Sequence, residues 1–365
     1  MSEKVAIKEL LEGVEVEWKP LSEIAIIGTG SRNTNEASEN GEYPFFVRSQ
    51  LPRRIDDYEF DETAIITSGD GVGVGKNFHY VTGKYGLHQR AYRIVTNDIN
   101  VNSKFLYYYF LSSFHNYIIK KSVHASVTSL RKPMFEKFLI PIPSPKAQSE
   151  IVRILDNFTE LTAELTAELT ARKKQYSYYR DKLLTFEDGG VEFKALGEVV
   201  KIKNGKDWKK LEKGSIPVYG SGGIMGFVNT PSYSKVSVLI PRKGTITNIF
   251  YTEEPFWNVD TIFYTRINED IIIPKYFYYF MSNYNLTSLS TDSTRPSLTQ
   301  TILNKILIPI PSLEEQKRIV SSLDKFDILT NSISEGLPKE IELRKKQYEY
   351  YRELLLTFPK QDIKV

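Results

Sequence analysis

A 15-residue stretch occurs twice in the chain. Residues 172–186 read RKKQYSYYRDKLLTF and residues 344–358 read RKKQYEYYRELLLTF, so 12 of 15 positions are identical. A second shared block precedes each copy: residues 137–144 are KFLIPIPS and residues 305–312 are KILIPIPS, identical at 7 of 8 positions. The 365-residue chain therefore divides into two similar halves, in agreement with the two or three domains expected for its length.

The connection between the two shared blocks differs between the halves. Ser144 and Arg172 are 28 positions apart, whereas Ser312 and Arg344 are 32 apart. The shorter connection contains its own small repeat, TELTAELTAELTA, at residues 159–171. The second connection is therefore longer by four residues, about one helical turn.

A long helix is expected after each IPIPS block. Apolar side chains of the first copy follow a 3.5-residue repeat, which is typical of a coiled-coil seam, with Thr162 and Arg172 as weak positions. A helix over residues 146–186 is about 60 Å long, too long to be covered by one domain, so a partner helix is needed. The seam residues are Ile151, Leu155, Phe158, Leu165, Leu169, Tyr176, Tyr179 and Leu183 in the first copy and Ile319, Leu323, Phe326, Ile333, Tyr348, Tyr351 and Leu355 in the second.

The second connection also contains the run Ser-Glu-Gly-Leu-Pro at residues 334–338. Glycine favours the end of a helix, and proline interrupts a helix but is well suited to a first turn. The sequence therefore predicts a continuous first helix and a second helix that is broken near Gly336 and restarts at Pro338.

The residues that precede each long helix indicate a mixed α+β module. Strands are expected at residues 45–47 and 64–67 in the first half and at 217–219 and 236–240 in the second. Helices are expected at residues 103–121 and, opening on Pro274, at 276–284. The predicted fold is α+β: two globular α/β domains joined by two long helices packed as an antiparallel coiled coil, with pseudo-twofold symmetry. In such a molecule the paired helices hold the two domains at opposite ends and set the distance between them.

The predicted domain boundaries follow from these elements. The first domain covers residues 1–143 and the first spacer helix residues 144–188. The second domain covers residues 189–311 and the second spacer helix residues 312–365. A turn-rich run, Glu-Asp-Gly-Gly at residues 187–190, separates the halves.

Composition limits the class of protein. The formal net charge of +3 is too close to neutral to indicate a nucleic-acid partner by itself. The absence of cysteine excludes disulfides and thiolate metal sites. No run approaches the ~18 apolar residues of a membrane span, and the N-terminus lacks the apolar core of a signal peptide. We expect a cytoplasmic protein without a membrane segment.

Catalytic signals are weak throughout the chain. The loop GDGVGVG at residues 69–75 follows a strand but lacks the G-x-G-x-x-G spacing, and the next residues read as a strand rather than a helix, so a turn is favoured over a phosphate site. The four histidines form no H-x-x-x-H or H-E-x-x-H pattern. No motif of the kind that binds a flipped base in amino-methyltransferases is present. We therefore expect no catalytic residue and no metal site in this chain.

Basic and hydroxyl-rich loops remain, at matching places in the two halves. Residues 201–213 carry six lysines, and residues 122–132 and 290–299 precede the two IPIPS blocks. Lysine and arginine neutralise phosphates, and small polar side chains contact the DNA backbone or base edges, so such loops suit duplex DNA. The candidate DNA-binding residues are Arg48, Lys76, Arg90, Ser126, Thr128, Arg131, Lys132, Lys206, Lys209, Lys210, Ser221, Arg242, Lys243, Thr294, Arg295 and Ser297.

The two-part cassette resembles that of the specificity subunits of type I restriction-modification systems. The resemblance rests on IPIPS-x-x-x-Q followed by a helix that ends in RKKQYxYYR, and on the tandem Thr-Ala-Glu-Leu units. The segments IPVYGSGGI at residues 216–224 and VLIPRKGT at 238–245 are similar to a common form of the family's target recognition domain. One departure is Ala147, where the second copy and the usual pattern have glutamate (Glu315).

The resemblance implies a non-catalytic subunit in which each domain reads half of a split DNA sequence and the helices set the unread gap. It implies double-stranded DNA, two modification (methyltransferase) subunits and restriction/motor subunits as partners. No cofactor is implied in this chain, because S-adenosylmethionine, ATP and Mg²⁺ belong to the partner subunits. The implied partner-binding residues are Gln148, Gln316, Arg172, Lys173, Tyr176, Tyr179, Arg344, Lys345, Tyr348 and Tyr351.

Two other functions are compatible with the residues alone. One is a coiled-coil scaffold or adaptor without DNA binding, which salt-sensitive binding to random duplex would argue against. The other is a methyltransferase with divergent motifs, which binding of S-adenosylmethionine to the isolated chain would support. The two half-sites and the gap length are not readable from the sequence, because base contacts depend on how the loops dock in the groove.

Overall fold

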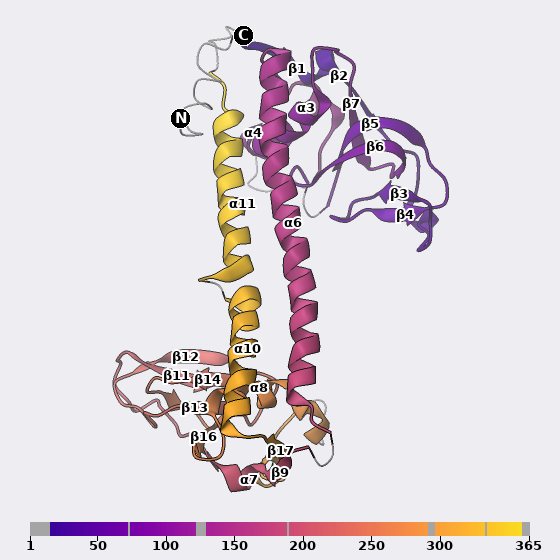
Figure 1. The fold of residues 1–365 in the computed structure, drawn as a ribbon. Helices are drawn as coiled ribbons and strands as arrows, with labels where there is room; N and C mark the ends of the chain where they lie inside the picture. The colour runs from indigo at the N-terminus through magenta and orange to yellow at the C-terminus, as the bar shows by residue number, and fades with distance from the viewer. Residues whose placement is uncertain are drawn as a thin grey trace. The chain divides into compact units, whose positions relative to one another are not determined.

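The structure is a computed structural model that describes residues 15–71, 74–121, 129–187, 190–290, 296–332 and 334–359. The chain divides into two compact units (Figure 1). Unit 1 combines Met1–Glu164 with Ile341–Val365, and unit 2 is Leu165–Glu340. These units do not coincide with the two halves of the sequence, because each unit contains helical segments from both halves.

A six-stranded sheet with strand order β2-β7-β5-β6-β3-β4 forms the centre of unit 1. All pairings are antiparallel except β3 with β6, and β1 pairs separately with β8. The strands are β1 (Glu17–Pro20), β2 (Ala25–Thr29), β3 (Tyr43–Phe46), β4 (Arg53–Ile55), β5 (Phe60–Ser68), β6 (Phe78–Leu87), β7 (Ala91–Thr96) and β8 (Leu139–Ile142).

Helices cover this sheet and supply most of the aromatic core. The predicted single helix over residues 103–121 is α3 (Ser103–Tyr109), a π-helical turn (Phe110–Phe114) and α4 (His115–Lys121). Short helices α2 (Leu21–Ile24) and α5 (Lys132–Glu136) complete the domain. Phe114 is fully buried and stacks on Phe135, with ring centroids 5.0 Å apart.

Unit 2 contains three small sheets, with strand orders β10-β16-β13-β14, β12-β11-β15 and β17-β9. The strands are β9 (Glu192–Ala195), β10 (Val200–Lys203), β11 (Ile216–Gly220), β12 (Gly223–Val228), β13 (Ser237–Pro241), β14 (Phe250–Thr252), β15 (Trp257–Asn258), β16 (Ile262–Ile267) and β17 (Leu307–Ile310). The helices of this domain are α7 (Leu196–Val199), α8 (Pro274–Asn283) and α9 (Gln300–Leu303). Pro274 stands in the first turn of α8, as the sequence predicts.

The predicted continuous first spacer helix is confirmed. Helix α6 runs without interruption over Pro145–Leu184, and residues 145–164 belong to unit 1 whereas residues 165–184 belong to unit 2. The predicted break in the second helix is also confirmed, because α10 (Leu313–Asn331) ends before α11 (Gly336–Leu355) begins. The predicted restart at Pro338 is wrong by two residues, since α11 begins at Gly336. Helices α10 and α11 hold 19 and 20 residues, one fewer in total than the 40 of α6. The four extra residues of the second connection therefore match the length of the interruption between α10 and α11.

Gly336 explains where the second helix restarts. Its φ of 72° lies in the left-handed region, and a Cβ at this position would overlap the carbonyl oxygens of Ile328 and Leu329. The backbone N–H of Glu335 donates to Ser332 Oγ at 3.1 Å, which stabilises the turn before α11. Pro338 then lies in the first turn of that helix, where its missing N–H has no cost.

The substitution Gly336→Ala is expected to destabilise unit 2 by about 1–3 kcal/mol, because alanine adds both backbone strain and a steric overlap. Thermal unfolding would measure the loss. The matched control is Glu335→Ala, at an exposed position in the same interruption, which keeps the backbone N–H that donates to Ser332. Equal unfolding temperatures for Gly336→Ala and the control would contradict this account of the break.

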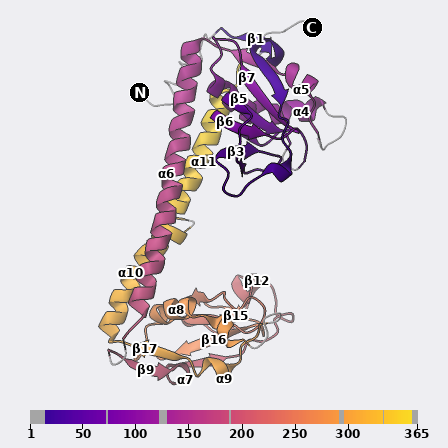
Figure 2. The same cartoon turned by 90° about the vertical axis from the view of Figure 1, so that its right-hand side faces the viewer.

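Half of the described seam residues of the spacer helices are buried, and the seam is completed within each unit by a segment from the other half of the sequence. In unit 1, Phe158 of α6 stacks on Tyr351 of α11 at 5.2 Å. In unit 2, Phe326 of α10 stacks on Tyr179 of α6 at 5.7 Å. Figure 2 shows α11 beside the N-terminal part of α6. The same pair of repeat positions therefore makes the same contact twice. Ile333 of the predicted seam lies outside the described residues.

Candidate nucleic-acid interface

In both units a loop that follows a central strand is held by the segment that precedes the IPIPS block. In unit 1, Leu130 N donates to Gly69 O at 2.7 Å, and Asp70 forms an isolated antiparallel bridge with Ser129. In unit 2, Leu298 N donates to Arg242 O at 2.8 Å, and Lys243 bridges Ser297 in the same way. The sequence prediction that these segments occupy matching places is confirmed for the residues that the structure describes.

The Asp70 carboxylate binds two of the predicted arginines in unit 1. It accepts from Arg48 Nη1 at 3.4 Å and from Arg90 Nη1 at 3.1 Å. The two side chains remain 47% and 62% exposed. Each guanidinium has five N–H groups, so most of its donors stay available for a phosphate or a base edge. The Asp70 carboxylate thus places two exposed cations side by side.

His88 supports the turn that carries Arg90. Its side chain is 5% exposed, and Nδ1 accepts from the backbone N–H of Arg90 at 3.0 Å. Burial, with smaller contributions from Arg48 and Arg90, lowers the pKa of His88 below its ordinary value. The ring is therefore neutral at pH 7, which this acceptor role requires.

Acid is expected to weaken unit 1 through His88. Because the folded-state pKa lies below that of the unfolded chain, its stabilising contribution is fully present above pH ~6.5 and is lost as the pH falls below that value. Urea unfolding at pH 7.5 and at pH 5.5 would measure this. His88→Asn, which removes the titration, should flatten part of the pH dependence; the same slope in both chains would contradict the assignment.

Three further predicted residues of unit 1 are described by the structure, and each has its own surroundings. Lys76 is exposed and lowers the pKa of His115, whose depression comes mainly from burial. Arg131 is exposed at the N-cap of α5, and Lys132 Nζ lies 3.9 Å from Glu136. None of these contacts prevents a role in DNA binding, and that role stays a prediction.

Thr261 brings three of the predicted residues of unit 2 together. Its carbonyl oxygen accepts from Arg242 N at 2.8 Å and from Lys243 N at 3.3 Å. Its hydroxyl oxygen accepts from Ser221 N at 3.3 Å. The Arg242 guanidinium lies 5.8 Å from the Phe263 ring centroid, whereas Lys243 is exposed. Ser297, opposite Lys243 in the bridge, is exposed as well.

The lysines of residues 206–210 form a second basic segment in unit 2. Lys206, Lys209 and Lys210 are exposed. The backbone anchors the segment, because Lys206 N donates to Asn258 O at 2.9 Å and Lys206 O accepts from Trp257 Nε1 at 3.0 Å.

Four further predicted residues, Ser126, Thr128, Thr294 and Arg295, lie outside the described residues.

Lys243→Ala is expected to weaken DNA binding at every sequence and to reduce the slope of log affinity against log salt by about 0.9, the value for one lost phosphate contact on duplex DNA. Binding to a labelled duplex at several salt concentrations would measure both effects. Lys235→Ala, at an exposed position in the same unit, is the control. An unchanged slope of log affinity against log salt would show that Lys243 makes no phosphate contact.

The predicted partner-binding residues divide into buried and exposed groups. Gln148 and Gln316 are fully buried, and their amide groups bond to the chain's own backbone, so they present no surface to a partner in this structure. We therefore reassign both glutamines to an internal role. Lys173 and Lys345 are exposed.

The remaining members of that group lie on the repeated helix ends. Arg172 and Arg344 each donate to a glutamine three residues later, Gln175 and Gln347, at 3.0 Å. Tyr176 and Tyr348 are half-buried, and burial raises the pKa of Tyr176 to about 12. Tyr179 is 39% exposed, whereas Tyr351 is buried. Contact of these side chains with a partner stays a prediction.

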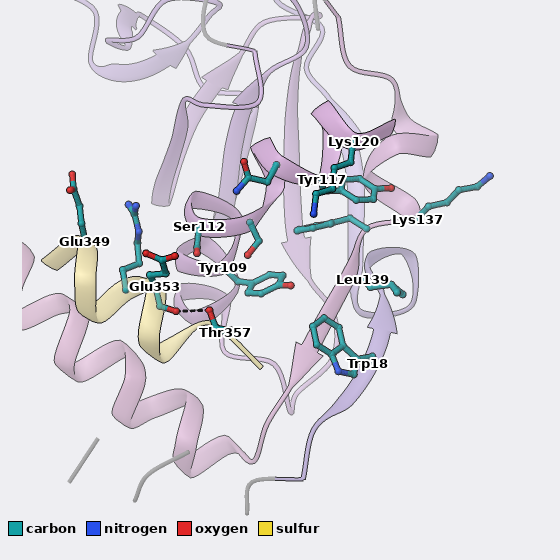
Figure 3. Close-up of a pocket in the computed structure, with 14 residues that line it drawn as sticks. Trp18, Tyr109, Ser112, Tyr117, Lys120, Lys137, Leu139, Glu349, Glu353 and Thr357 are labelled. Atoms are coloured by element: carbon teal, nitrogen blue, oxygen red, sulfur yellow. Dashed lines mark hydrogen bonds between the residues drawn. The ribbon is translucent and has the colours of Figure 1, made fainter. Parts of the chain in front are cut away.

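A cavity of about 790 Å³ lies within unit 1, between α11 and the first domain (Figure 3). Glu349, Arg352 and Glu353 line it from α11, and Trp18 and Lys137 line it from the domain. Figure 3 shows that the opposing groups come from separate elements, and the lining carries charges of both signs.

The described residues contain no group of three or more histidine, aspartate or glutamate side chains able to hold a metal ion. Among the same residues, no helix is long and apolar enough to cross a membrane. The Gly69–Asp70 turn is followed after residue 75 by strand β6, and this agrees with the predicted turn rather than a phosphate-binding helix start.

Comparison with known proteins places these features in a family. The model of the "Type I restriction modification DNA specificity domain" matches residues 13–172 and again residues 189–343. A putative type I restriction enzyme specificity subunit of Haemophilus influenzae is 34% identical, over 96% of this chain and 98% of its own. A type I restriction enzyme specificity subunit of Escherichia coli is 35% identical, over 99% of each chain.

Solved structures support the same fold. The crystal structure of a type I restriction-modification system S subunit from M. genitalium matches with a TM-score of 0.65 at 21% identity, over 96% of this chain and 98% of the other. A chain from a study of assembly and conformational transition of the type I R-M system matches with a TM-score of 0.60 at 15% identity, over 95% and 98%.

Proposed function

Because the chain belongs to the type I restriction-modification DNA specificity family, we propose that each of its two units reads one half of a split DNA sequence. The observation that carries this proposal is the repeated loop closure, which holds Asp70 in unit 1 and Lys243 in unit 2. The loop of unit 1 gathers Arg48 and Arg90 at the Asp70 carboxylate, and the loop of unit 2 presents Lys243 itself. The chain contributes sequence specificity and not catalysis, in keeping with its family.

The basic side chains fit the chemistry of a DNA groove. Arg48 and Arg90 in unit 1 and Arg242 in unit 2 can each donate two parallel hydrogen bonds to guanine O6 and N7, the commonest specific contact. Lys206, Lys209 and Lys243 are exposed point charges that suit phosphates. The arginines are therefore proposed to read bases, and the lysines to fix position on the duplex.

The spacer helices are proposed to pack as an antiparallel coiled coil that sets the unread gap, giving the molecule its pseudo-twofold symmetry. Supporting this, α6 is continuous, and in each unit a helix start from one half of the sequence packs on a helix end from the other half. The repeated helix ends, with their exposed lysines, are proposed to bind two modification subunits, and restriction/motor subunits complete the assembly in the cytoplasm. S-adenosylmethionine, ATP and Mg²⁺ are proposed to be bound by those partners.

Methylome sequencing of cells that express this chain with its modification subunit would test the proposal. We expect one bipartite motif with two specific half-sites and a fixed gap, and no such motif without this chain. A gel shift with random duplex should show binding that weakens as salt rises. Methylation at unsplit or random sites, or salt-independent behaviour, would favour the scaffold alternative.

A further inference from the structure

Each domain is bonded to the start of its spacer helix by the same set of side chains. In unit 1, α6 contributes Gln148 and Asp156, and α3 contributes Lys104 and Tyr108. In unit 2, α10 contributes Gln316 and Asp324, and α8 contributes Lys275 and Tyr279. We call each set a clamp.

The glutamine fixes the first turn of the spacer helix. In unit 1, Gln148 Oε1 accepts from Asn102 N at 2.8 Å, while Nε2 donates to Asn100 O at 2.9 Å and to Pro143 O at 2.8 Å. The amide is fully buried and has three bonds to two different segments. It therefore ties the IPIPS strand, the turn before α3 and the helix together.

Gln316 repeats this arrangement in unit 2. Its Oε1 accepts from Ile273 N at 2.8 Å, and its Nε2 donates to Ile271 O at 3.0 Å and to Pro311 O at 2.9 Å. Buried polar groups are costly unless their bonds are made, so three satisfied bonds specify one orientation of the side chain.

The aspartate fixes the same helix two turns later. Tyr108 Oη donates to Asp156 Oδ1 at 2.5 Å, and Lys104 Nζ lies 2.8 Å from Asp156 Oδ2. In unit 2, Tyr279 donates to Asp324, and Lys275 Nζ lies 2.9 Å from Asp324 Oδ1. Burial, together with the bonded carboxylate, raises the pKa of both tyrosines, so each hydroxyl remains a donor at neutral pH.

Two attachment points eight residues apart on the spacer helix restrain its orientation more strongly than a single attachment point would. The glutamine and the aspartate are separated by about 12 Å along the helix, so together they fix both the tilt and the rotation of the spacer helix against its domain. One base pair corresponds to about 3.4 Å and roughly 35°. A looser attachment would let a domain meet the duplex one base pair out of place.

We propose that the two clamps are positioning devices which set the length of the recognised gap, by fixing the angle of each domain to its spacer helix. Gln148, Asp156 and Tyr108, with Gln316, Asp324 and Tyr279, are then determinants of spacing although none of them contacts DNA. This inference rests on the proposed function, because it assumes a bipartite target.

The test removes the tyrosine–aspartate bond without leaving either of these two partners unpaired, and the lysines that lose the carboxylate, Lys104 and Lys275, are 37% and 36% exposed. The double variants Tyr108→Phe/Asp156→Leu and Tyr279→Phe/Asp324→Leu replace both partners with apolar groups, which costs far less stability than removal of one partner. The matched control is Glu160→Leu, at an exposed acidic position of α6 outside the repeated helix ends. Each chain is expressed with its modification subunit, and the methylome is sequenced.

We expect both half-sites to be unchanged in the clamp variants, while methylation at sites with a gap one base pair longer or shorter rises about tenfold, in line with the loss of roughly one hydrogen bond of restraint. The control should retain the wild-type gap. A merely structural role would lower total methylation without changing the share of off-gap sites, and that result would overturn the proposal.

Thermal unfolding accompanies each measurement. If a double variant does not accumulate as folded protein, the single variants Tyr108→Phe and Tyr279→Phe decide by the same readout, and an unchanged off-gap share in both overturns the proposal. If the wild-type chain itself yields no bipartite motif, the proposed function fails, and that outcome is distinct from failure of the clamps.

Discussion

Deletion of residues 166–169 from α6 is expected to shorten the recognised gap by about one base pair. These four residues form one Thr-Ala-Glu-Leu unit inside an uninterrupted helix. Their removal shortens the helix by about 6 Å and rotates its two ends against each other by about 40° beyond a full turn. One base pair advances the duplex by about 3.4 Å and roughly 35°. The rotation of about 40° caused by the deletion is close to the rotation of roughly 35° for one base pair. This rotation determines which groove of the duplex a loop faces.

The deletion can be separated from a general loss of stability. A length-preserving control, Thr166→Ala with Glu168→Ala, changes the same exposed surface and keeps the seam residue Leu169. Methylome sequencing should report the shorter gap with both half-sites intact for the deletion, and the original gap for the control. An unchanged gap in the deletion variant would contradict the proposal that the length of α6 sets the gap. New half-sites would show that the domains themselves had changed.

The helical framework was predictable because it depends on local periodicity. The 3.5-residue repeat around Ile151 and Leu155 indicated a seam, and both residues are fully buried. The break at Gly336 was predictable because glycine and proline act through the backbone alone. The π-helical turn at Phe110–Phe114 was not predicted, since an inserted residue in one turn leaves no period of its own.

The clamps were missed although the sequence contains a signal. Leu-Asp-x-Phe recurs at residues 155–158 and 323–326, and Lys-x-x-Tyr-Tyr recurs at 104–108 and 275–279. Each motif is too short to indicate that it contacts the other, because Tyr108 and Asp156 are 48 positions apart and Tyr279 and Asp324 are 45 apart. The resemblance assigned Gln148 and Gln316 to a partner surface, and the burial of both amides corrects this.

The sequence also did not predict which helical segments belong to which compact unit. Contacts such as Phe158 with Tyr351 join positions nearly 200 residues apart, and a repeated seam does not say which copy packs on which. Among the candidate DNA-binding residues, Arg48 and Arg90 both bond to the Asp70 carboxylate, and nothing in their sequence spacing indicated this shared partner.

A chain that stops at Glu340 is expected to lose the fold of unit 1 and to keep that of unit 2. The core of unit 1 includes four buried side chains from the C-terminal segment, Tyr351, Leu355, Leu356 and Phe358. At about 1.5–3 kcal/mol for each buried side chain, their loss amounts to about 6–12 kcal/mol. This is comparable with the whole stability of a domain, about 5–15 kcal/mol. Unit 2 ends at Glu340 and loses none of its own core.

Hydrogen exchange would distinguish the two units directly. In the chain ending at Glu340, backbone amides of β5, β6 and β7 should lose protection, whereas those of β13 and β16 should keep it, because exchange reports the local free energy of opening. A chain ending at Pro359 is the matched control, since it retains the buried side chains and the bond from Trp18 Nε1 to Pro359 O at 3.3 Å. A peptide of residues 341–359 added to the shorter chain should restore protection in unit 1. Protected β5–β7 amides without the peptide would show that the C-terminal helix is an accessory to the first domain and not part of its core.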